Sequence, residues 1–413
     1  MNSNPTPLEP KAGRESVRRH NLSLVLRAVH DEGEATRAGV AARVGLTRAA
    51  VSSLVEQLLV SGFLTESGKT FSGQAGRPGT VLKVARTGPA GLGVEVNIDY
   101  VSVCVVDLAG TDRVRLTEHL DNRGVPPHEV LGRAARIAAR ALESAGEQEL
   151  RPVGMELALP GLVSAGTVRQ APNLGWSRVA AEDLFARALA GQRPDGPALP
   201  VSAENEANLA ALAELWFGGL GSVRTFLYLT GEIGVGGAVV LDGELLRGAH
   251  GFAGEIGHVV VEPDGPECRC GSRGCLEQYA GQSALLRAAG LDENAGAAGV
   301  AELERRARDG DRRALEALEA AGARLGQVLS GAVNLLDPDA VVLGGIYRGL
   351  MPWLFPAAGR ELTGRVVSGL WAKDSGRLRA SSLAGDAARG AAALVVRNVL
   401  ADPAAYAEIA RRA

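Results

Sequence analysis

The 413-residue chain has few aromatic residues, few cysteines and no long apolar run. Aromatic residues make up 4% of the chain, and only four residues are cysteine. No apolar run approaches the ~20 residues that a membrane-spanning helix requires. The N-terminus is polar and lacks the apolar segment of a secretion signal. These absences argue against a disulfide scaffold and a membrane protein, and we expect a cytoplasmic protein without a membrane partner.

A strong overall charge is also missing, because 44 basic residues face 47 acidic ones for a net charge of −3. The charges are unevenly distributed along the chain. Residues 1–84 carry 11 Lys and Arg against 7 Asp and Glu, whereas the remainder carries 33 against 40. A basic head on an acidic body points to an attached nucleic-acid-binding module. The length itself predicts two or three domains.

Three of the four cysteines crowd into one glycine-rich loop. Cys268, Cys270 and Cys275 have the spacing C-x-C-x4-C, and His258 lies ten positions before the first of them. Three thiolates and one imidazole form a ligand set that tetrahedral zinc prefers. Four protein ligands leave no open position, so we expect one structural zinc ion per chain. The alternatives are three unmodified thiols or a disulfide, which would leave one cysteine unpaired.

The first 84 residues predict a disordered tail followed by a DNA-binding head. Residues 1–14 are polar, contain proline and glycine, and show no apolar periodicity. Apolar residues then recur at helical spacing up to about Gly33. Thr36 is placed to cap a helix over 37–43, and Thr47 to cap another that reaches about Val60. Two helices joined by a glycine-containing turn predict a helix-turn-helix.

A wing is predicted to follow the second of these helices. Residues 63–65 and 80–84 have strand character, and the segment between them contains Gly-Arg-Pro at 76–78, which suits the minor groove. The alternative is a three-helix bundle that binds protein. The side chains expected to contact DNA are Arg37, Thr47, Arg48, Ala49, Ser52, Ser53 and Arg77.

Residues 88–400 alternate between β-branched runs and helical patterns, which predicts an α/β body. Gly88 and Pro89 are expected to separate this body from the head. A strand hairpin is predicted within 90–108. The other predicted strands are 152–159, 226–230, 237–241 and 340–343, and the predicted helices are 127–145, 302–309, 312–336 and 384–400.

The motif Gly-Glu-Ile-Gly-His at 254–258, followed by C-x-C-G-x-x-G-C-x-E at 268–277, resembles the signature of the ROK family of repressors and sugar kinases. The resemblance extends along essentially the whole chain. It includes the winged head, which ROK repressors carry and ROK kinases lack. It implies an actin-like, two-lobed α/β fold with a ligand in the cleft between the lobes. The implied domains are a tail (1–14), a winged helix-turn-helix (15–84) and a sugar-binding body (88–400) with its zinc loop at 258–275.

The resemblance also implies a sugar site. In the family's kinases an Asn-Asp pair opens a helix, and the Asp deprotonates the attacking sugar hydroxyl; this chain has Asn205-Glu206. The longer side chain still accepts a hydrogen bond, but it shifts the base by about 1 Å, which costs on the order of a hundredfold in rate. The alternatives are a plain helix cap and surface charge. The implied sugar contacts are Gly161, Asn173, Asn205, Glu206, Glu255, His258 and Glu277.

The two turns that approach ATP phosphates in the kinases are altered in this chain. Where the first turn of the kinases has a glycine pair and a threonine, this chain has Asn97, Ile98 and Asp99, although Glu95 keeps the preceding acidic position. The second turn has Glu232-Ile233 in place of Gly-Thr. Phosphates need accessible backbone N–H groups, so we expect Ile98 to block them and Asp99 to repel them. We therefore expect no ATP binding, no catalytic residue and no enzyme activity.

Three functions remain to be compared. The first is a sugar-responsive repressor, the second an ATP-dependent sugar kinase with an attached DNA-binding domain, and the third a DNA-binding scaffold without a ligand. The altered phosphate turns argue against the kinase, and the retained sugar residues argue against the scaffold. We expect the repressor, acting as a homodimer or homotetramer on a palindromic operator. Sugar binding would change the spacing of its paired heads.

Overall fold

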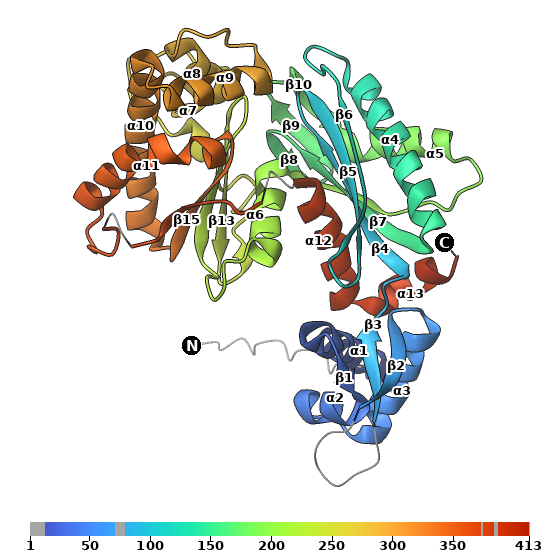
Figure 1. Ribbon diagram of the computed structural model, residues 1–413. Coiled ribbons are helices and arrows are strands. Elements are labelled where there is room, and N and C mark those ends of the chain that lie inside the picture. The colour runs from blue at the N-terminus through green and yellow to red at the C-terminus, as the bar shows by residue number, and fades with distance from the viewer. Residues whose placement is uncertain (1–12, 71–78, 373–374, 384–386, 413) are drawn as a thin grey trace, which may run out of the picture.

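The computed structural model describes residues 13–70, 79–372, 375–383 and 387–412. Two lobes lie side by side, and a smaller head lies beneath the N-terminal lobe (Figure 1). Among the described helices, none combines the length and the hydropathy that crossing a bilayer requires. The described residues do not include Arg77 or the rest of the predicted wing tip. They also do not include residues 1–12 of the predicted tail.

The head has the winged helix-turn-helix order predicted from the sequence. Thr36 Oγ1 accepts the N–H of Gly39 at 3.1 Å, and Thr47 Oγ1 accepts the N–H of Ala50 at 3.2 Å, so both predicted caps are formed. Gly45, with φ +70°, supplies the left-handed turn between the two helices. The antiparallel sheet has the order β1-β3-β2. The elements are α1 (Arg14–Glu32), β1 (Ala35–Thr36), α2 (Arg37–Val44), α3 (Arg48–Val60), β2 (Leu64–Thr70) and β3 (Gly79–Val84).

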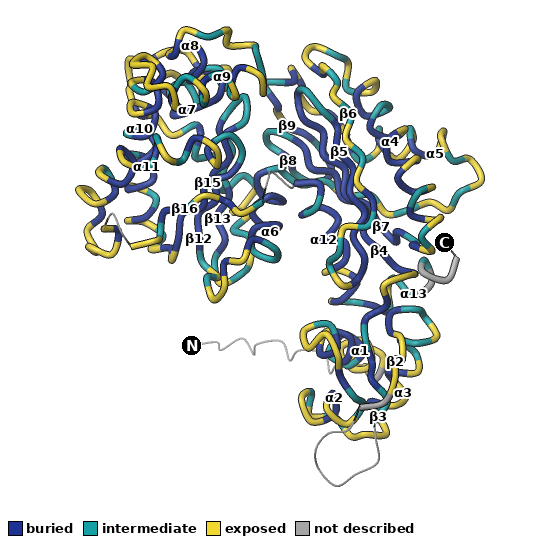
Figure 2. The backbone as a smooth tube through the Cα atoms, viewed as in Figure 1, coloured by how far each residue is buried: buried dark blue, intermediate teal, exposed yellow. Residues whose placement is uncertain are grey.

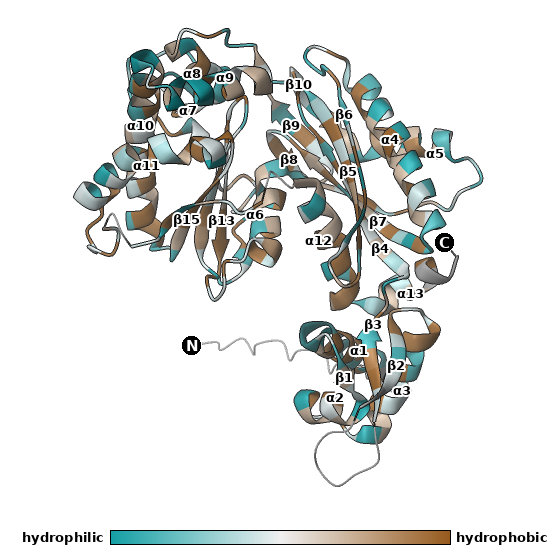
Figure 3. Cartoon of the chain, in the orientation of Figure 1, coloured by the Kyte–Doolittle hydropathy of each residue, from teal (hydrophilic) through white to brown (hydrophobic). Residues whose placement is uncertain are grey.

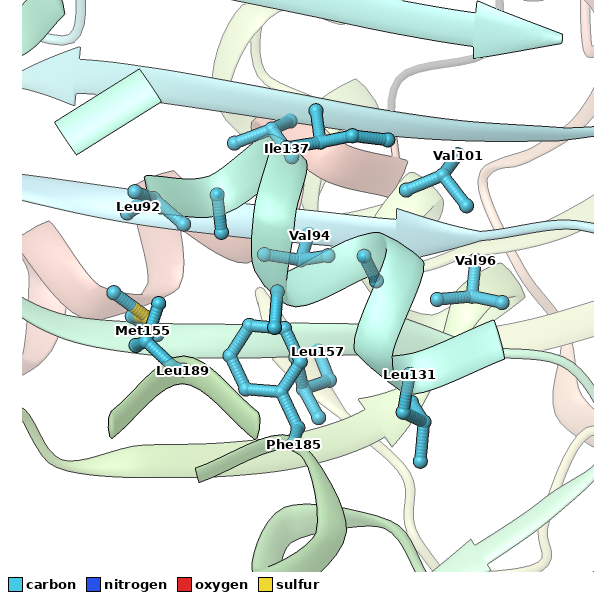
Figure 4. Packing of buried hydrophobic residues seen from close by; sticks show 14 of the residues in the cluster. Leu92, Val94, Val96, Val101, Leu131, Ile137, Met155, Leu157, Phe185 and Leu189 are labelled. Carbon is cyan, nitrogen blue, oxygen red and sulfur yellow. The ribbon is translucent and has the colours of Figure 1, made fainter. Parts of the chain in front are cut away.

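The N-terminal lobe is built on a five-stranded sheet of order β11-β7-β4-β5-β6. β7 and β11 run parallel to β4, whereas β5 and β6 extend it antiparallel. Two helices cover one face, where Leu131 and Phe185 pack on Val94 and Leu157 (Figure 4). The bounds are β4 (Gly88–Val96), β5 (Tyr100–Asp107), β6 (Asp112–His119), α4 (Pro127–Glu147), β7 (Leu150–Leu159), α5 (Ala181–Gln192) and β11 (Val201–Asn205). A small separate sheet contains β8 (Leu162–Ser164), β9 (Thr167–Ala171) and β10 (Trp176–Ala180).

The C-terminal lobe repeats this topology. Its sheet has the order β14-β13-β12-β15-β16, so in both lobes the first strand of the sheet lies in the middle, with an antiparallel extension on one side and parallel strands on the other. The strands are β12 (Phe226–Gly231), β13 (Val235–Leu241), β14 (Glu244–Leu245), β15 (Ala340–Gly345) and β16 (Leu378–Ala380). The outer helices are α7 (Glu277–Ala280), α8 (Gln282–Ala288), α9 (Gly296–Arg308), α10 (Arg312–Leu336) and α11 (Ile346–Arg365).

Two helices lie between the sheets and pack against each other. They are α6 (Glu206–Phe217), which lies against the C-terminal sheet, and α12 (Ala387–Ala401), which lies against the N-terminal sheet. A Cβ atom on Gly91 or Gly93 would come within 2.1 or 2.0 Å of a backbone oxygen of α12, so these glycines allow the close contact. Burial concentrates in the two sheets and these two helices, while the outer helix faces are exposed and hydrophilic (Figures 2 and 3). The fold is the predicted actin-like, two-lobed one.

The junction between head and body differs from the prediction. Gly88 and Pro89, expected to separate the two, are the first residues of strand β4. The head and the N-terminal lobe also share one buried apolar cluster, in which α1 and α3 meet α12. Ser23 Oγ donates to the carbonyl of Leu400 at 2.9 Å within this cluster. A last helix that the sequence did not predict, α13 (Pro403–Arg412), follows α12. Asp402, between these two helices, forms an ion pair with Arg19 of the head.

Candidate functional site

A cavity between the lobes brings together all seven residues that the sequence predicted to contact a sugar. Gly161, Asn173, Asn205 and Glu206 line it from the N-terminal side and the start of α6, and Glu255, His258 and Glu277 line it from the C-terminal lobe. The altered phosphate turns reach the same cavity through Asn97, Ile98, Glu232 and Ile233.

Asn205 holds two parts of this cavity together. Its Oδ1 accepts the N–H groups of Ala207 at 2.9 Å and Asn208 at 3.1 Å, which caps α6. Its Nδ2 donates to the carbonyl of Gly161 at 2.9 Å. Gly161 has φ +86°, and a Cβ there would lie 2.2 Å from the carbonyl oxygen of Gln170, so the position requires glycine. Asn205 thus caps the helix, as the alternative interpretation expected, and it also forms part of the cavity wall.

Glu206 is the first residue of α6, and its carboxylate lies among other acids. Its Oε2 atom is buried, and nothing in the described part of the chain hydrogen-bonds to it. Burial raises the pKa of Glu206 well above its ordinary value, and Glu232 and Glu95 raise it further. Burial likewise raises the pKa of Glu232 to about 8, with added repulsion from Glu95 and Asp99. At neutral pH this part of the cavity therefore holds protons that exposed carboxylates would have lost.

The first altered phosphate turn differs from our expectation in its details. We expected the side chain of Ile98 to block the approach of phosphate, but it is only 4% exposed and packs into the core of the N-terminal lobe. The backbone N–H of Ile98 instead donates to Oδ1 of Asn97 at 2.6 Å. The N–H of Asn97 donates to the carbonyl of Tyr100 at 2.9 Å. Both of these backbone N–H groups are therefore already hydrogen-bonded within the hairpin.

The second phosphate turn also has backbone N–H groups that already donate hydrogen bonds within the protein. The N–H of Val235 donates to Oε2 of Glu277 at 3.2 Å, and the N–H of Glu232 donates to the carbonyl of Gly234 at 2.9 Å. A Cβ on Gly234 would lie 2.1 Å from Oε2 of Glu277, and one on Gly237 would lie 2.6 Å from the carbonyl oxygen of Gly254. Close packing in the turn and at the start of β13 accounts for these glycines.

His258, Cys268, Cys270 and Cys275 form a cluster whose ligand atoms all lie within 4.8 Å of one another. The Sγ atoms of Cys270 and Cys275 are 3.8 Å apart, as are Sγ of Cys268 and Nδ1 of His258. A zinc ion with Zn–S bonds of about 2.3 Å and tetrahedral angles separates its sulfur ligands by about 3.8 Å. Burial raises the pKa of the Cys268 thiol to about 12, and a bound cation would offset this by stabilising the thiolate. The cluster is thus compatible with a zinc ion.

The cluster is directly connected to the cavity. The other nitrogen of His258, Nε2, lies 3.8 Å from Oε2 of Glu255, so Nδ1 faces the thiols and Nε2 faces the cavity wall. Oε1 of Glu277 lies 3.7 Å from Sγ of Cys268. Burial raises the pKa of Glu255, His258 lowers it and Glu277 raises it again. The metal-type cluster therefore contains or adjoins the three predicted sugar-binding residues of the C-terminal lobe.

Two contacts across the cleft were not predicted from the sequence. Arg269, which lies between the first two cysteines, donates from Nη1 to Oδ1 of Asn173 at 3.1 Å. Arg247 pairs through Nε with Oε2 of Glu204 at 3.0 Å. Each contact joins the C-terminal lobe to the N-terminal one. Both depend on the relative placement of the lobes, and sequence spacing carries no signal for that.

Most of the predicted DNA-contacting residues form one exposed surface on the head. Thr47, Arg48, Ala49, Ser52 and Ser53 are all exposed at or near the start of α3. Arg37 is different, because its Nη1 pairs with Oε1 of Glu66 on β2 at 2.7 Å. Its guanidinium is thus already paired within the head.

Comparison with known proteins agrees with this architecture. A model of the ROK family matches residues 91–398. The chain belongs to the ROK family. A protein of Caldicellulosiruptor sp. strain Rt8B.4, described as a putative xylose repressor, is 31% identical over 342 residues, which cover 79% of this chain and 83% of the relative.

Two solved ROK structures differ in how much of the chain they cover. A ROK family transcriptional regulator, described as a homologue of the E. coli MLC protein, aligns over 96% of this chain and 99% of its own, with a TM-score of 0.78 and 23% identity. A ROK family glucokinase from Streptomyces griseus, solved with glucose and AMPPNP, aligns over 74% of this chain and 98% of its own, with a TM-score of 0.60 and 26% identity. The fold is thus shared with both, but the kinase matches a smaller share of this chain than the regulator does.

Proposed function

We propose that this protein is a sugar-responsive transcriptional repressor. It binds operator DNA through the winged head and a carbohydrate effector in the cavity between the lobes. The observation that carries the proposal is the contrast within this cavity. The residues implied to bind sugar converge there, whereas the N–H groups of Ile98 and Val235, in the two turns that approach phosphates in the kinases, already donate hydrogen bonds within the protein. The similarity to a putative xylose repressor supports the same function.

The same contacts argue against phosphoryl transfer. Catalysis would require Glu206 to accept the proton of the sugar hydroxyl, but its raised pKa favours the protonated form, which cannot do so. The donors at Ile98 and Val235 would have to give up their hydrogen bonds before a phosphate could bind. We therefore assign no catalytic residue.

We also propose one structural zinc ion per chain, held by His258, Cys268, Cys270 and Cys275. Four ligands complete a tetrahedral shell, so the ion would stabilise the loop and supply no open coordination site. Its role in the function is indirect. By orienting the imidazole of His258, it would place Nε2 beside Glu255 and so shape the sugar site.

The proposed signal passes from the cavity to the head along α12. The N–H of Ala388, at the start of this helix, donates to Oε2 of Glu95 at 3.2 Å, and Glu95 lies beside the acids of the cavity. The other end of α12 lies in the apolar cluster shared with α1, where Ser23 binds Leu400. A change in lobe closure would thus move the head, and in a homodimer or homotetramer it would alter the spacing of heads on a palindromic operator.

Binding measurements on the full-length protein test this proposal. DNA selected from a random pool by the purified protein supplies a fluorescent probe for anisotropy, and a panel of free sugars is then added. We expect one sugar to change the DNA affinity, while a coupled assay for ADP detects no turnover of ATP with the panel. Arg48→Ala should weaken DNA binding about tenfold without changing sugar affinity. Sugar-dependent ADP formation would instead favour a kinase with an attached DNA-binding domain.

A further inference from the structure

We propose that the effector is an unphosphorylated, non-anionic sugar, and that Glu232 is the residue that rejects phosphorylated ones. This inference rests on the proposed function, because it assigns the class of effector to the same cavity. It makes Glu232, which stands where the kinases carry a glycine, a specificity-determining residue.

The first argument is the charge of the cavity wall. Four of its described lining residues are glutamates, namely Glu206, Glu232, Glu255 and Glu277, and none is lysine or arginine. The one further ionisable group, His258, has Nδ1 directed at the thiols of the cysteine cluster and Nε2 beside Glu255. At pH 8, where this group of carboxyls is partly ionised, a phosphate or carboxylate on the ligand would meet like charge without a compensating cation among the described lining residues. Hydroxyl groups, by contrast, can donate hydrogen bonds to every one of these oxygens.

The second argument concerns backbone donors, which bind phosphates in many proteins without any cation. Here they are occupied. At the start of α6, Oδ1 of Asn205 accepts the N–H groups of Ala207 and Asn208. In the two turns, Asn97 accepts from Ile98, and Glu277 accepts from Val235. An anionic group entering the cavity finds these donors satisfied by the protein's own oxygens.

The third argument is the position of Glu232 between two spaces. It lines the interlobe cavity, and it also lines a neighbouring cleft of about 800 Å³. The ionisable residues of that cleft also include Glu95, Tyr100, His119, Arg348 and Arg115, the last of which pairs with Asp112. A Cβ atom added to Gly345 would lie only 3.1 Å from Oε1 of Glu232, so the two residues lie close together. Among the acids that raise the pKa of Glu206, Glu232 has the largest effect, so a phosphate attached to a sugar hydroxyl bound at Glu206 would lie near the Glu232 carboxyl group. Glu232 thus lies at the boundary between the interlobe cavity and this cleft.

Glu206 supplies the complementary preference. Its buried Oε2 has no hydrogen-bond partner in the described part of the chain, and an unpaired buried acceptor is unfavourable. A free hydroxyl on the sugar can donate to it. An esterified hydroxyl has lost its proton to the phosphate linkage and cannot. The same position therefore favours the free sugar and disfavours its phosphate ester.

Matched pairs of ligands test the inference on the full-length protein. Isothermal titration calorimetry at pH 8 compares glucose with glucose 6-phosphate, and N-acetylglucosamine with its 6-phosphate, alongside xylose as a sugar without a sixth carbon. For a pair whose parent sugar binds, we expect the phosphate to bind at least about 100-fold more weakly. In Glu232→Gln this ratio should fall at least about tenfold. Glu232→Ser serves as a second variant if the first is poorly folded.

The control is Glu316→Gln, which removes one negative charge from the exposed surface of α10 and should leave the ratio unchanged. A sugar 6-phosphate that binds more tightly than its parent would overturn the inference while leaving a sugar effector in place. An unchanged ratio in both Glu232 variants would overturn the role of Glu232. If no member of the panel binds and none alters DNA affinity, the proposed function itself fails.

Discussion

The two walls of the interlobe cavity have different structures. The wall of the C-terminal lobe is held by a cluster with the ligand set of zinc, which positions Glu255, His258 and Glu277 through contacts of 3.7 to 3.8 Å. The wall formed by the two former phosphate turns is held by the protein's own hydrogen bonds, from Ile98 to Asn97 and from Val235 to Glu277. Glu277 belongs to both walls.

Under the proposed function, this difference separates recognition of a sugar from reaction with it. Recognising a sugar needs acceptors in the right places, and a braced loop provides them. Transferring a phosphoryl group also needs exposed donors and an ionised base. In the second wall the N–H groups of Ile98 and Val235 are already hydrogen-bonded, and burial raises the pKa of Glu206, which favours its protonated form. The predictions below perturb each wall in turn.

The largest effect is expected from breaking the first wall at the cysteine cluster. Cys270→Ser removes one of four ligands, so zinc content should fall from about one ion per chain to near zero. The sugar response of DNA binding should be lost, and Tm should fall by about 5 °C or more. Zinc analysis, anisotropy and thermal unfolding measure these quantities. Cys104→Ser, on β5 and outside the cluster, should retain the metal; normal zinc content in Cys270→Ser would contradict the assignment.

A milder perturbation of the same wall removes one charge while keeping its shape. Glu255→Gln should weaken sugar binding about 10- to 100-fold, because a charged acceptor makes the stronger hydrogen bond to a hydroxyl. Zinc content should not change. Glu267→Gln is the matched control, since Glu267 lies in the same loop but is exposed and pairs with Arg273. Equal losses in both variants would show that the loop, and not the carboxylate, is responsible.

How much of these walls the sequence predicts depends on the range of the interactions. The metal-type cluster was predictable because its three cysteines lie within eight residues, and the caps at Thr36 and Thr47 because each bonds three residues ahead. The lobes and the sugar residues followed from the ROK resemblance. The amino-acid composition alone predicts neither the lobes nor the sugar residues.

The features that escaped prediction are conformational or long-range. The sequence shows that Asn97 and Ile98 replace glycines, but not that Asn97 takes the donor while Ile98 turns into the core. The links from Arg269 to Asn173 and from Ser23 to Leu400 join residues 96 and 377 positions apart. No local pattern encodes such pairs.

The second wall can be returned toward the kinase pattern. A variant carrying Asn97→Gly, Glu206→Asp and the pair Glu232→Gly with Ile233→Thr frees the N–H of Ile98 and shortens the base. Ile98 is kept because it is buried in the core. We expect sugar-dependent ADP formation about tenfold above the background of the original protein, far below a natural kinase. The same variant with Glu206 retained is the control. If it shows equal turnover, the position of the base is not what limits the reaction.

The smallest effect concerns the protons held in the second wall. The pKa of Glu232 is about 8 in the folded protein, against 4.5 when the chain is unfolded, because of burial and the repulsion of Glu95 and Asp99. Glu206 from α6 and Tyr100 from β5 also lie near it. Between pH 4.5 and 8 the folded state therefore binds the extra proton, and stability falls as pH rises through this window.

Thermal unfolding between pH 6 and pH 9 measures this effect. The decrease in Tm should be smaller in Glu232→Gln than in the original protein by about 2 °C, because glutamine carries no titrating proton. Glu316→Gln on the exposed face of α10 should follow the original curve. If Glu232→Gln also follows it, the Glu232 carboxyl is ionised throughout this range. The second wall would then repel anions equally at every pH tested, and the contrast between the two walls would rest on the occupied backbone donors alone.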